Sequence, residues 1–398
     1  MWRAQPIEPI EFSWYDYRGY TFSLGLDVDG HVVNSGHSGS SWNPLTGKPD
    51  VVGGMAEQTQ VAYAKQQTVL AAAGLSLNDV TRVVENVTIE GLAHYAQTEQ
   101  VRRRVFGAHE PVVVTVVVDR LVRRKALVEI EVHASPGGGD ALVTGGNGRW
   151  RRDTVREGHD GVVYLPTLLP IDSAGQVVAA GDLAGQYEYC LERAADLLDR
   201  AGLSIARLVS TTEYVTPPSR RAGAEVDRVR AALLGPLYPA TAGVVMSRLH
   251  EPGVLVAVDA VASRRPLQRV VPDQLGPAAL TRSPAARAGN TLYLSGLALV
   301  NETEPVARPP GDLRAQATLL YRAIFATMAA AGCPPEGLLS TVEFITPGAL
   351  PAYRDVADVR RELLREPYPV STGIVCASLL RPEFSIDVHA TALVPAGV

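Results

Sequence analysis

The chain has 398 residues, of which 46% are hydrophobic and 20% charged, a composition typical of folded globular proteins. A net charge of −5 excludes the basic surface that nucleic-acid binding needs. No apolar run approaches the roughly 18 residues that span a bilayer, and the first twelve residues lack the apolar segment of a signal peptide. Three scattered cysteines predict neither a disulfide framework nor a zinc site, so we expect a cytoplasmic protein without membrane contact.

Taken in chain order, the predicted elements recur three times. A hairpin ending near Ser35 precedes a helical pattern over residues 55–74, where apolar residues return every three to four positions before a closing glycine. A strand, a shorter helix and two further strands follow. The same order, β-β-α-β-α-β-β, returns in two later units, which predicts an α+β fold with helices packed on a sheet.

The repeat period is measured by two landmarks. Hexapeptides VVENVT, TTEYVT and TVEFIT carry Glu85, Glu213 and Glu343, which are 128 and 130 residues apart. The prolines of EPVVVTVVVDR, YPATAGVVMSR and YPVSTGIVCAS keep the same two spacings. We therefore expect units at 12–135, 153–264 and 282–396, joined by a flexible glycine-rich linker at 136–152 and a second linker at 265–281.

Several quoted stretches carry a family resemblance. The strand ending in Ser35-Gly36, the NPLTGK turn, the helix EQT…VLAAAG and the strand VEIEVHA resemble the Rid family (YjgF/YER057c/UK114), the enamine/imine deaminases. The resemblance implies chorismate-mutase-like units that close as a trimer, with ligand clefts between neighbours. Three linked copies then imply an intramolecular pseudo-trimer, monomeric or further self-associated, that binds a small molecule in its inter-unit clefts.

The resemblance also exposes a departure. The family's deaminases carry an arginine two residues after the motif's proline, where a guanidinium can grip a carboxylate. This sequence has Val113, Thr241 and Ser371 there. Arg120 and Arg248, further along, are either substitutes or strand-end surface arginines. Hydroxyls in the same motif are candidate ligand contacts: Thr115, Thr241, Ser371 and Thr372.

Carboxylates supply the candidate catalytic groups. The family positions a water with a glutamate on the closing strand; counting by 128 residues, its counterparts are Glu129, Ala257 and Ser385, so only the first unit keeps it. By the same count Glu131, Asp259 and Asp387 form an acidic series, and His133 and His389 share a position.

The repeated strand glutamates form the second group of candidates. Glu85, Glu213 and Glu343 fall on an apolar strand face, so each is either paired with an arginine in a structural role or a raised-pKa acid/base in a catalytic one.

A polar cluster in the first unit, NSGHSGSSWNP, completes the candidate site. Ser35 and Gly36 offer backbone amides, His37 titrates near neutrality and Trp42 offers an aromatic wall, although a hairpin tip has the same composition. Ser295 and Gly296 repeat the first pair in the third unit.

We therefore predict a divergent Rid-family biosynthetic enzyme, for example of secondary metabolism. It would act on a small imine, enamine or related carbonyl-derived metabolite by acid/base-assisted hydrolysis, tautomerisation or cyclisation, without metal or cofactor. The alternatives are a non-catalytic ligand-binding or regulatory pseudo-trimer, and a chorismate-converting enzyme by analogy of fold.

Overall fold

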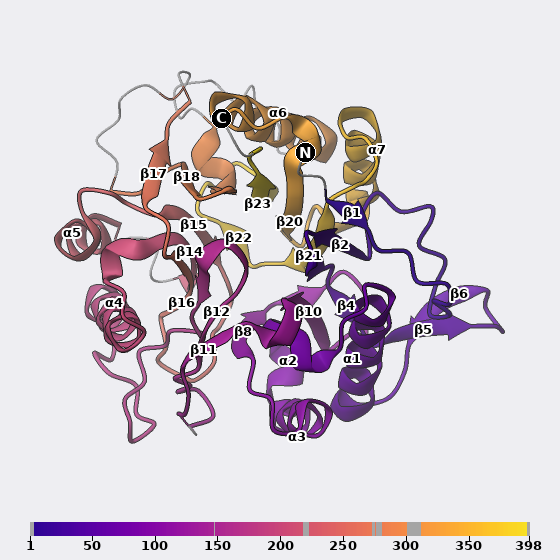
Figure 1. Ribbon diagram of the computed structural model, residues 1–398, viewed down its shortest axis with the longest axis horizontal. Helices are drawn as coiled ribbons and strands as arrows, with labels where there is room; N and C mark the ends of the chain where they lie inside the picture. Colours follow the sequence, from indigo (N-terminus) through magenta and orange to yellow (C-terminus); the bar gives the residue numbers. More distant parts are fainter. Residues whose placement is uncertain are drawn as a thin grey trace.

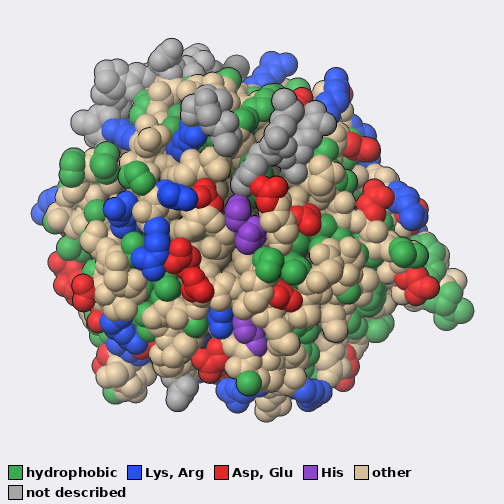
Figure 2. Space-filling model, viewed as in Figure 1, with side chains coloured by type: hydrophobic (Ala, Val, Ile, Leu, Met, Phe, Trp, Pro, Cys, Tyr) green, Lys and Arg blue, Asp and Glu red, His purple; other side chains and the backbone are tan. Residues whose placement is uncertain are grey.

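The computed structural model describes residues 4–146, 148–217, 223–272, 275, 281–300 and 312–395. Three units surround a common centre, with their sheets inside and their long helices outside (Figure 1). Within these ranges no helix is both long and apolar enough to cross a membrane. On the face that Figure 2 shows, acidic and basic side chains are interspersed.

Unit 1 is built on a seven-stranded sheet with three helices. Along the sheet the strands are β1 (Gln5–Pro6), β2 (Gly25–Val28), β3 (His31–Asn34), β10 (Val128–Ala134), β7 (Val80–Thr88) and β8 (Val112–Val118), and β4 (His37–Ser38) pairs with β10. The helices are α1 (Met55–Ala72), α2 (Ile89–Leu92) and α3 (Tyr95–Phe106). A separate hairpin, β5 (Ser40–Asn43) and β6 (Lys48–Val51), projects at the right of Figure 1.

Unit 2 repeats this plan with two described helices, α4 (Leu183–Arg200) and α5 (Gly223–Leu234). Its own strands run in the order β11 (Asp140–Val143), β12 (Val155–Glu157), β13 (Val162–Tyr164), β16 (Val256–Ser263), β14 (Leu208–Val215) and β15 (Ala240–Val245). Strand β11 lies within the segment 136–152 that was expected to be a linker, so part of that segment is an edge strand of unit 2.

Unit 3 carries α6 (Leu313–Ala330) and α7 (Arg354–Leu363). Its strands are β17 (Leu267–Val270), β18 (Ala285–Ala288), β19 (Thr291–Leu294), β23 (Ile386–Leu393), β20 (Leu338–Ile345) and β21 (Val370–Val375). Strand β17 lies within the segment 265–281 that was expected to be a linker, so this part of the segment is an edge strand of unit 3. Residues 273–274, 276–280 and 396 lie outside the described residues.

The long helix of each unit ends in the same way. Gly74, Gly202 and Gly332 follow α1, α4 and α6 with φ of 74°, 73° and 72°. A residue with a Cβ is strained in this left-handed conformation, whereas glycine is not. The three glycines therefore end three equivalent helices, as their place after each apolar pattern predicts.

Short strands exchanged between units close the ring. β9 (Arg120–Leu121) of unit 1 pairs with β21 of unit 3, and β22 (Ser378–Leu379) of unit 3 pairs with β15 of unit 2. The third junction is made by unit 2, whose Ser247 N–H donates to Asp119 (3.0 Å) and whose His250 Nε2 lies 2.9 Å from the Thr115 carbonyl oxygen. Each unit thus extends or caps its neighbour's sheet edge, and three such junctions make a closed pseudo-trimer.

The strand pairing corrects the expected alignment of the closing strands. Glu129 lies opposite Asn86, Ala257 opposite Tyr214, and Asp387 opposite Phe344, in each case the residue after the repeated glutamate. The counterpart of Glu129 in unit 3 is therefore Asp387. The acidic series Glu131, Asp259 and Asp387 was wrong, and so was the shared position of His133 and His389.

Candidate active site between units 1 and 3

A cleft of about 600 Å³ opens between units 1 and 3. We name it the 1–3 cleft. Unit 1 contributes its N-terminal aromatic residues and polar side chains from β4, α1 and β10, whereas unit 3 contributes α7 and β21. The lining residues on which the argument depends are Phe22, Gly36, His37, Lys65, Arg123 and Glu129 from unit 1, and Tyr353, Ala357, Arg360 and Ser371 from unit 3.

Ser35 and Gly36 connect the two units at the edge of this cleft. The Ser371 N–H donates to Ser35 Oγ (2.9 Å), and the Gly36 N–H donates to Thr372 Oγ1 (3.1 Å). A Cβ at Gly36 would come within 2.6 Å of Glu129 Oε1, so only glycine lets the backbone approach this carboxylate. Four of the predicted site residues, Ser35, Gly36, Ser371 and Thr372, therefore meet across the inter-unit boundary.

Glu129 is the acid of the 1–3 cleft. It lies on β10 opposite Ser38 and is partly buried. Burial, and then the neighbouring Glu131, raise the pKa of Glu129 to about 7, although Arg123 and Lys65 act in the opposite direction. Since an ordinary glutamate is fully ionised at pH 7, this raised pKa allows Glu129 to give and take a proton near neutrality.

Lys65 is a second group that titrates near neutrality. From the buried side of α1 its Nζ donates to the Ser38 carbonyl oxygen (2.7 Å) and to Ser40 Oγ (3.1 Å). Burial, and then Arg123, lower the pKa of Lys65 to about 7, although Glu129 acts to raise it. A lysine with so low a pKa is partly neutral at pH 7 and can accept a proton.

His37 contributes shape and hydrogen bonding to the cleft wall. Its ring is buried, and Nδ1 lies 3.3 Å from the Tyr15 hydroxyl. Burial, and then the Lys65 ammonium, lower the pKa of His37 well below its ordinary value. His37 is therefore neutral at pH 7, so the expected titration near neutrality is wrong.

Arg360 supplies the guanidinium that the sequence motif lacks. From α7 its Nη1 donates to Ser371 Oγ (3.1 Å), at the very position where the family's deaminases carry an arginine. Its Nη2 lies 3.6 Å from Glu343 Oε2, and its buried Nε has no hydrogen-bond partner among the described residues. A guanidinium from the helix thus stands beside the motif and lines the 1–3 cleft.

The repeated strand glutamates are held in buried polar networks. Glu85 accepts from Arg102 Nη1 at 2.6 Å, and Glu213 accepts from Arg230 Nη2 at 2.8 Å, each arginine lying 17 residues after its glutamate, as Arg360 does after Glu343. A helix tyrosine donates to Oε1 in every unit, namely Tyr63, Tyr187 and Tyr321. Burial would raise the pKa of Glu85, but the Arg102 charge and the hydrogen bonds of Tyr95 and Arg102 lower it overall. The repeated 17-residue spacing was the sequence signal for Arg360.

The remaining predicted residues lie away from the 1–3 cleft. Trp42 is 47% exposed on the projecting β5–β6 hairpin. Arg120 lies in β9 opposite Val375, and Arg248 donates to the Leu249 carbonyl oxygen next to it. Thr115 lies between units 1 and 2, and Thr241 is buried against Thr211 in unit 2.

In unit 3 the residues that correspond to Ser35 and Glu129 form hydrogen bonds within the unit. Ser295 Oγ donates to the Ser283 carbonyl oxygen, and Asp387 Oδ1 accepts from the Leu297 N–H at 2.8 Å. Gly296 has a φ of 55°, and a Cβ there would collide with Asp387 Oδ1. Among the described residues no cluster of three or more His, Cys, Asp or Glu could hold a metal ion.

These features define a single-chain pseudo-trimer of α+β units with an open cleft between units 1 and 3. The sequence profile of the family described as Endoribonuclease L-PSP matches residues 19–135, 147–264 and 275–394. The chain therefore belongs to this family, the Rid family, in three tandem copies. Comparison with curated proteins gave no match.

Three of the solved structures that are similar to this chain illustrate the range of the matches. A putative endoribonuclease from Thermotoga maritima is 27% identical over 32% of this chain and 95% of its own, with a TM-score of 0.28. A YjgF/YER057c/UK114 family member from Mycobacterium tuberculosis is 29% identical over 28% and 85%, with a TM-score of 0.24. A chorismatase is 14% identical over 79% of this chain and 93% of its own, with a TM-score of 0.50, which shows a shared fold.

Proposed function

We propose that this protein is an enzyme whose active site is the 1–3 cleft. Its substrate is a small anionic imine, enamine or related carbonyl-derived metabolite, which it hydrolyses with acid/base assistance. The observation that carries this proposal is the presence of two groups with pKa of about 7, Glu129 and Lys65, in one cleft. Catalytic acids and bases work best when their pKa lies near the working pH.

The residues fit the steps of such a hydrolysis. Protonated Glu129 gives its proton to the carbon of an enamine or to the nitrogen of an imine, and either transfer forms an iminium ion. Water then adds to the carbon of the C=N bond, and neutral Lys65 accepts the proton that the water loses. Collapse of the resulting carbinolamine releases ammonia and leaves the carbonyl product. Arg360, beside Ser371, would hold the substrate's carboxylate during these steps.

The strand glutamates play a structural part in this proposal. Glu85 and Glu213 are buried and bonded to an arginine and a tyrosine, so neither carboxylate is available to a substrate. A cleft of 600 Å³ in a protein of net charge −5 also suits a small metabolite better than RNA.

A second candidate substrate is chorismate. It is supported by the likeness to a chorismatase over most of both chains and by the cationic lining that Arg123 and Arg360 give the 1–3 cleft. Chorismate is a dicarboxylate with an enol ether, and acid-assisted hydrolysis of an enol ether likewise begins with protonation of carbon. Glu129 would serve as the acid in either reaction.

One assay separates these readings. Purified protein is given a freshly generated 2-imino acid or chorismate, and ammonia and pyruvate are measured against buffer. We expect ammonia release from the imino acid above the rate in buffer, lost in Glu129→Gln. Pyruvate from chorismate instead would establish the second candidate. If neither compound reacts but either one binds, the non-catalytic reading holds and the proposed enzyme is excluded.

A further inference from the structure

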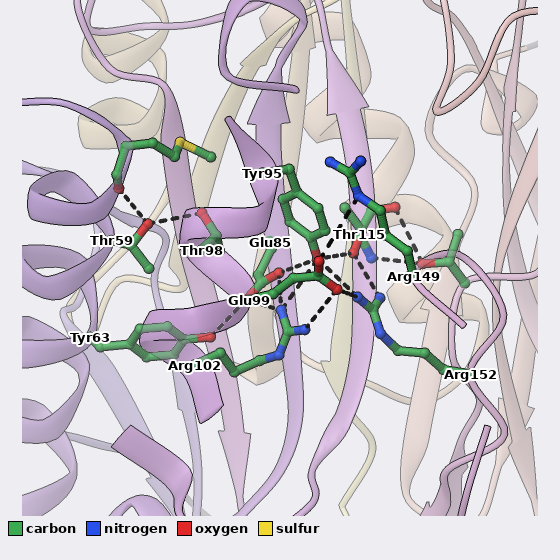
Figure 3. A network of polar contacts seen from close by, with 12 residues as sticks. Thr59, Tyr63, Glu85, Tyr95, Thr98, Glu99, Arg102, Thr115, Arg149 and Arg152 are labelled. Carbon is green, nitrogen blue, oxygen red and sulfur yellow. Dashed lines mark hydrogen bonds and ion pairs between the residues drawn. The ribbon is translucent and has the colours of Figure 1, made fainter. Parts of the chain in front are cut away.

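The cleft between units 1 and 2 is filled by the chain itself. We name it the 1–2 cleft. Residues 148–152 lie in the connection between β11 and β12 of unit 2. From this segment Arg152 reaches Tyr95 and Glu99 of α3 and Thr115 of β8 in unit 1 (Figure 3). The Trp150 ring stacks on Tyr95 with centroids 5.0 Å apart and an angle of 15° between the planes. Its Nε1 donates to Glu251 Oε1 (2.6 Å), so both ends of the indole are fixed.

Arg152 is the polar centre of this segment. Its Nη2 lies 3.1 Å from Glu99 Oε1 and donates to the Tyr95 hydroxyl (3.2 Å), and its Nη1 donates to Thr115 Oγ1 (3.2 Å). All three acceptors belong to unit 1, whereas Arg152 belongs to the segment of unit 2. Only 14% of the Arg152 side chain is exposed. Unit 1 therefore holds this guanidinium as a binding site holds a ligand, with one carboxylate and two hydroxyl oxygens.

The hydrogen-bond roles at Tyr95 show that the site is arranged for a cation. The Tyr95 hydroxyl donates its proton to Glu85 Oε2 (2.6 Å), which leaves its oxygen to accept from guanidinium groups. Arg102 already neutralises Glu85, to which its Nη1 is bonded at 2.6 and 2.8 Å. Arg102 and Arg149 lie further from Glu99, at 3.7 and 3.9 Å, so Arg152, at 3.1 Å, is the closest cation to the Glu99 carboxylate.

The 1–3 cleft has no counterpart of the Glu99 carboxylate or of the Arg152 guanidinium. Glu99 lies three residues before Arg102, and the residue three before Arg360 is Ala357, which lines the 1–3 cleft. Strand pairing identifies the counterpart of Arg152 in unit 1. Arg156 pairs with Tyr164 in unit 2 as Leu26 pairs with Val33 in unit 1. Arg152 lies four residues before Arg156, and the residue four before Leu26 is Phe22. Acid and guanidinium thus occur together in the filled cleft and are both replaced by apolar residues in the open one.

We infer that the 1–2 cleft is a guanidinium-binding site that the chain fills with its own Arg152. A ligand from solution has no place there while that side chain is present. The chemical class that the site takes is a small planar cation able to donate to one carboxylate and two hydroxyls. This inference does not depend on the reaction in the 1–3 cleft.

The test is chemical rescue of the full chain. In Arg152→Ala the midpoint of thermal unfolding should fall by several degrees, and methylguanidinium at millimolar concentration should restore it with a saturable dose dependence. Wild-type protein should show no saturable gain. The matched control is Arg151→Ala, because Arg151 donates to the Ile171 carbonyl oxygen and to the Tyr189 hydroxyl within unit 2. Potassium chloride at the same concentration as methylguanidinium is the control for ionic strength.

Three outcomes decide the inference. Saturable rescue of Arg152→Ala alone, abolished in Arg152→Ala/Glu99→Gln, supports it. An Arg152→Ala variant as stable as wild type, or equal rescue of Arg151→Ala, overturns it. Should Arg152→Ala not fold, Glu99→Gln in the otherwise intact chain gives the answer, since it should lower the midpoint if Glu99 binds Arg152 and an unchanged midpoint would overturn the assignment.

Discussion

The 1–3 and 1–2 clefts share a framework but differ in what fills them. Behind each lies a buried Glu–Tyr–Arg network, centred on Glu343 in one and Glu85 in the other. The 1–3 cleft keeps about 600 Å³ open, whereas the 1–2 cleft is occupied by Trp150 and Arg152. A homotrimer repeats every substitution in all three clefts, but three units in one chain can change each cleft separately.

The three units also differ at the position of Glu129 on the closing strand. Glu129 faces the open cleft with a pKa raised to about 7, while its counterpart in unit 2 is Ala257. Unit 3 keeps an acid, Asp387, but this accepts from the Leu297 N–H and lies 3.1 Å from His389 Nε2. Of the three positions, only Glu129 combines a carboxylate with an open cleft.

The largest expected effect is on turnover in Glu129→Gln. Removing a general acid typically costs 10²- to 10⁴-fold, so we expect kcat to fall at least about 100-fold with little change in the midpoint of thermal unfolding. In wild type kcat should be highest near pH 7 and decline on both sides, because Glu129 loses its proton above this pH and Lys65 gains one below it. Asp387→Asn is the control and should retain turnover; loss of kcat there instead would move the active site to unit 3.

Glu85→Gln should lower stability and leave turnover intact. The substitution leaves Arg102 charged and buried without its carboxylate, which typically costs about 3 kcal/mol or more. Chemical denaturation measures this loss, and exposed Glu188→Gln, expected within about 0.5 kcal/mol of wild type, is the control. A stable Glu85→Gln protein without activity would restore the catalytic reading of the strand glutamates.

Arg360→Lys should weaken substrate binding more than catalysis. Lysine keeps the positive charge near Glu343 but lacks the planar guanidinium that suits a carboxylate. We expect KM to rise about 10-fold, equivalent to about 1.4 kcal/mol, with kcat nearly unchanged. Steady-state kinetics on whichever candidate substrate reacts in the assay of ammonia and pyruvate measures both constants. An unchanged KM would show that Arg360 does not contact the substrate.

The smallest effect is a pH dependence of stability from Lys65. Its pKa is about 7 in the folded protein and about 10.5 in the unfolded chain, so the folded state binds fewer protons between these values. Its contribution to stability therefore rises from pH 7 towards pH 10.5 and is least favourable below pH 7. The free energy of unfolding of Lys65→Met, relative to wild type, should be higher at pH 6 than at pH 9. Lys125→Met, which removes an exposed lysine paired with Asp50, is the variant for comparison.

Local pattern predicted much of the fold because each unit repeats the same elements. The helix-ending glycines, the strand glutamates and the motif prolines recur at nearly constant spacing, and all mark equivalent places in the three units. The closing strand of unit 3 was misaligned by two residues because a spacing of 128 was carried into it. The spacing of 130 between Glu213 and Glu343 continues from Ala257 to Asp387.

The candidate site was less predictable, because its residues come from different units. Ser35, Gly36, Ser371 and Glu129 were named from the sequence, but Lys65 and Arg360 were not. The helical pattern around Lys65 gives no sign of its burial near Glu129. The 17-residue spacing marks Arg360 as the partner of Glu343 but does not show that Arg360 lines a cleft with unit 1. The filling of the 1–2 cleft was hidden for the same reason, since Arg149 to Arg152 resemble an ordinary basic stretch in a linker.

By itself, then, the sequence determined the family, the α+β units and their threefold repetition, since periodicity and spacing are local properties of the chain. Only the tertiary structure decided which cleft is open and which carboxylate has a raised pKa. Both depend on distances between units and on the exclusion of water. Glu129 and Glu85 are the same residue type on neighbouring strands, yet an adjacent arginine lowers the pKa of one and burial raises that of the other.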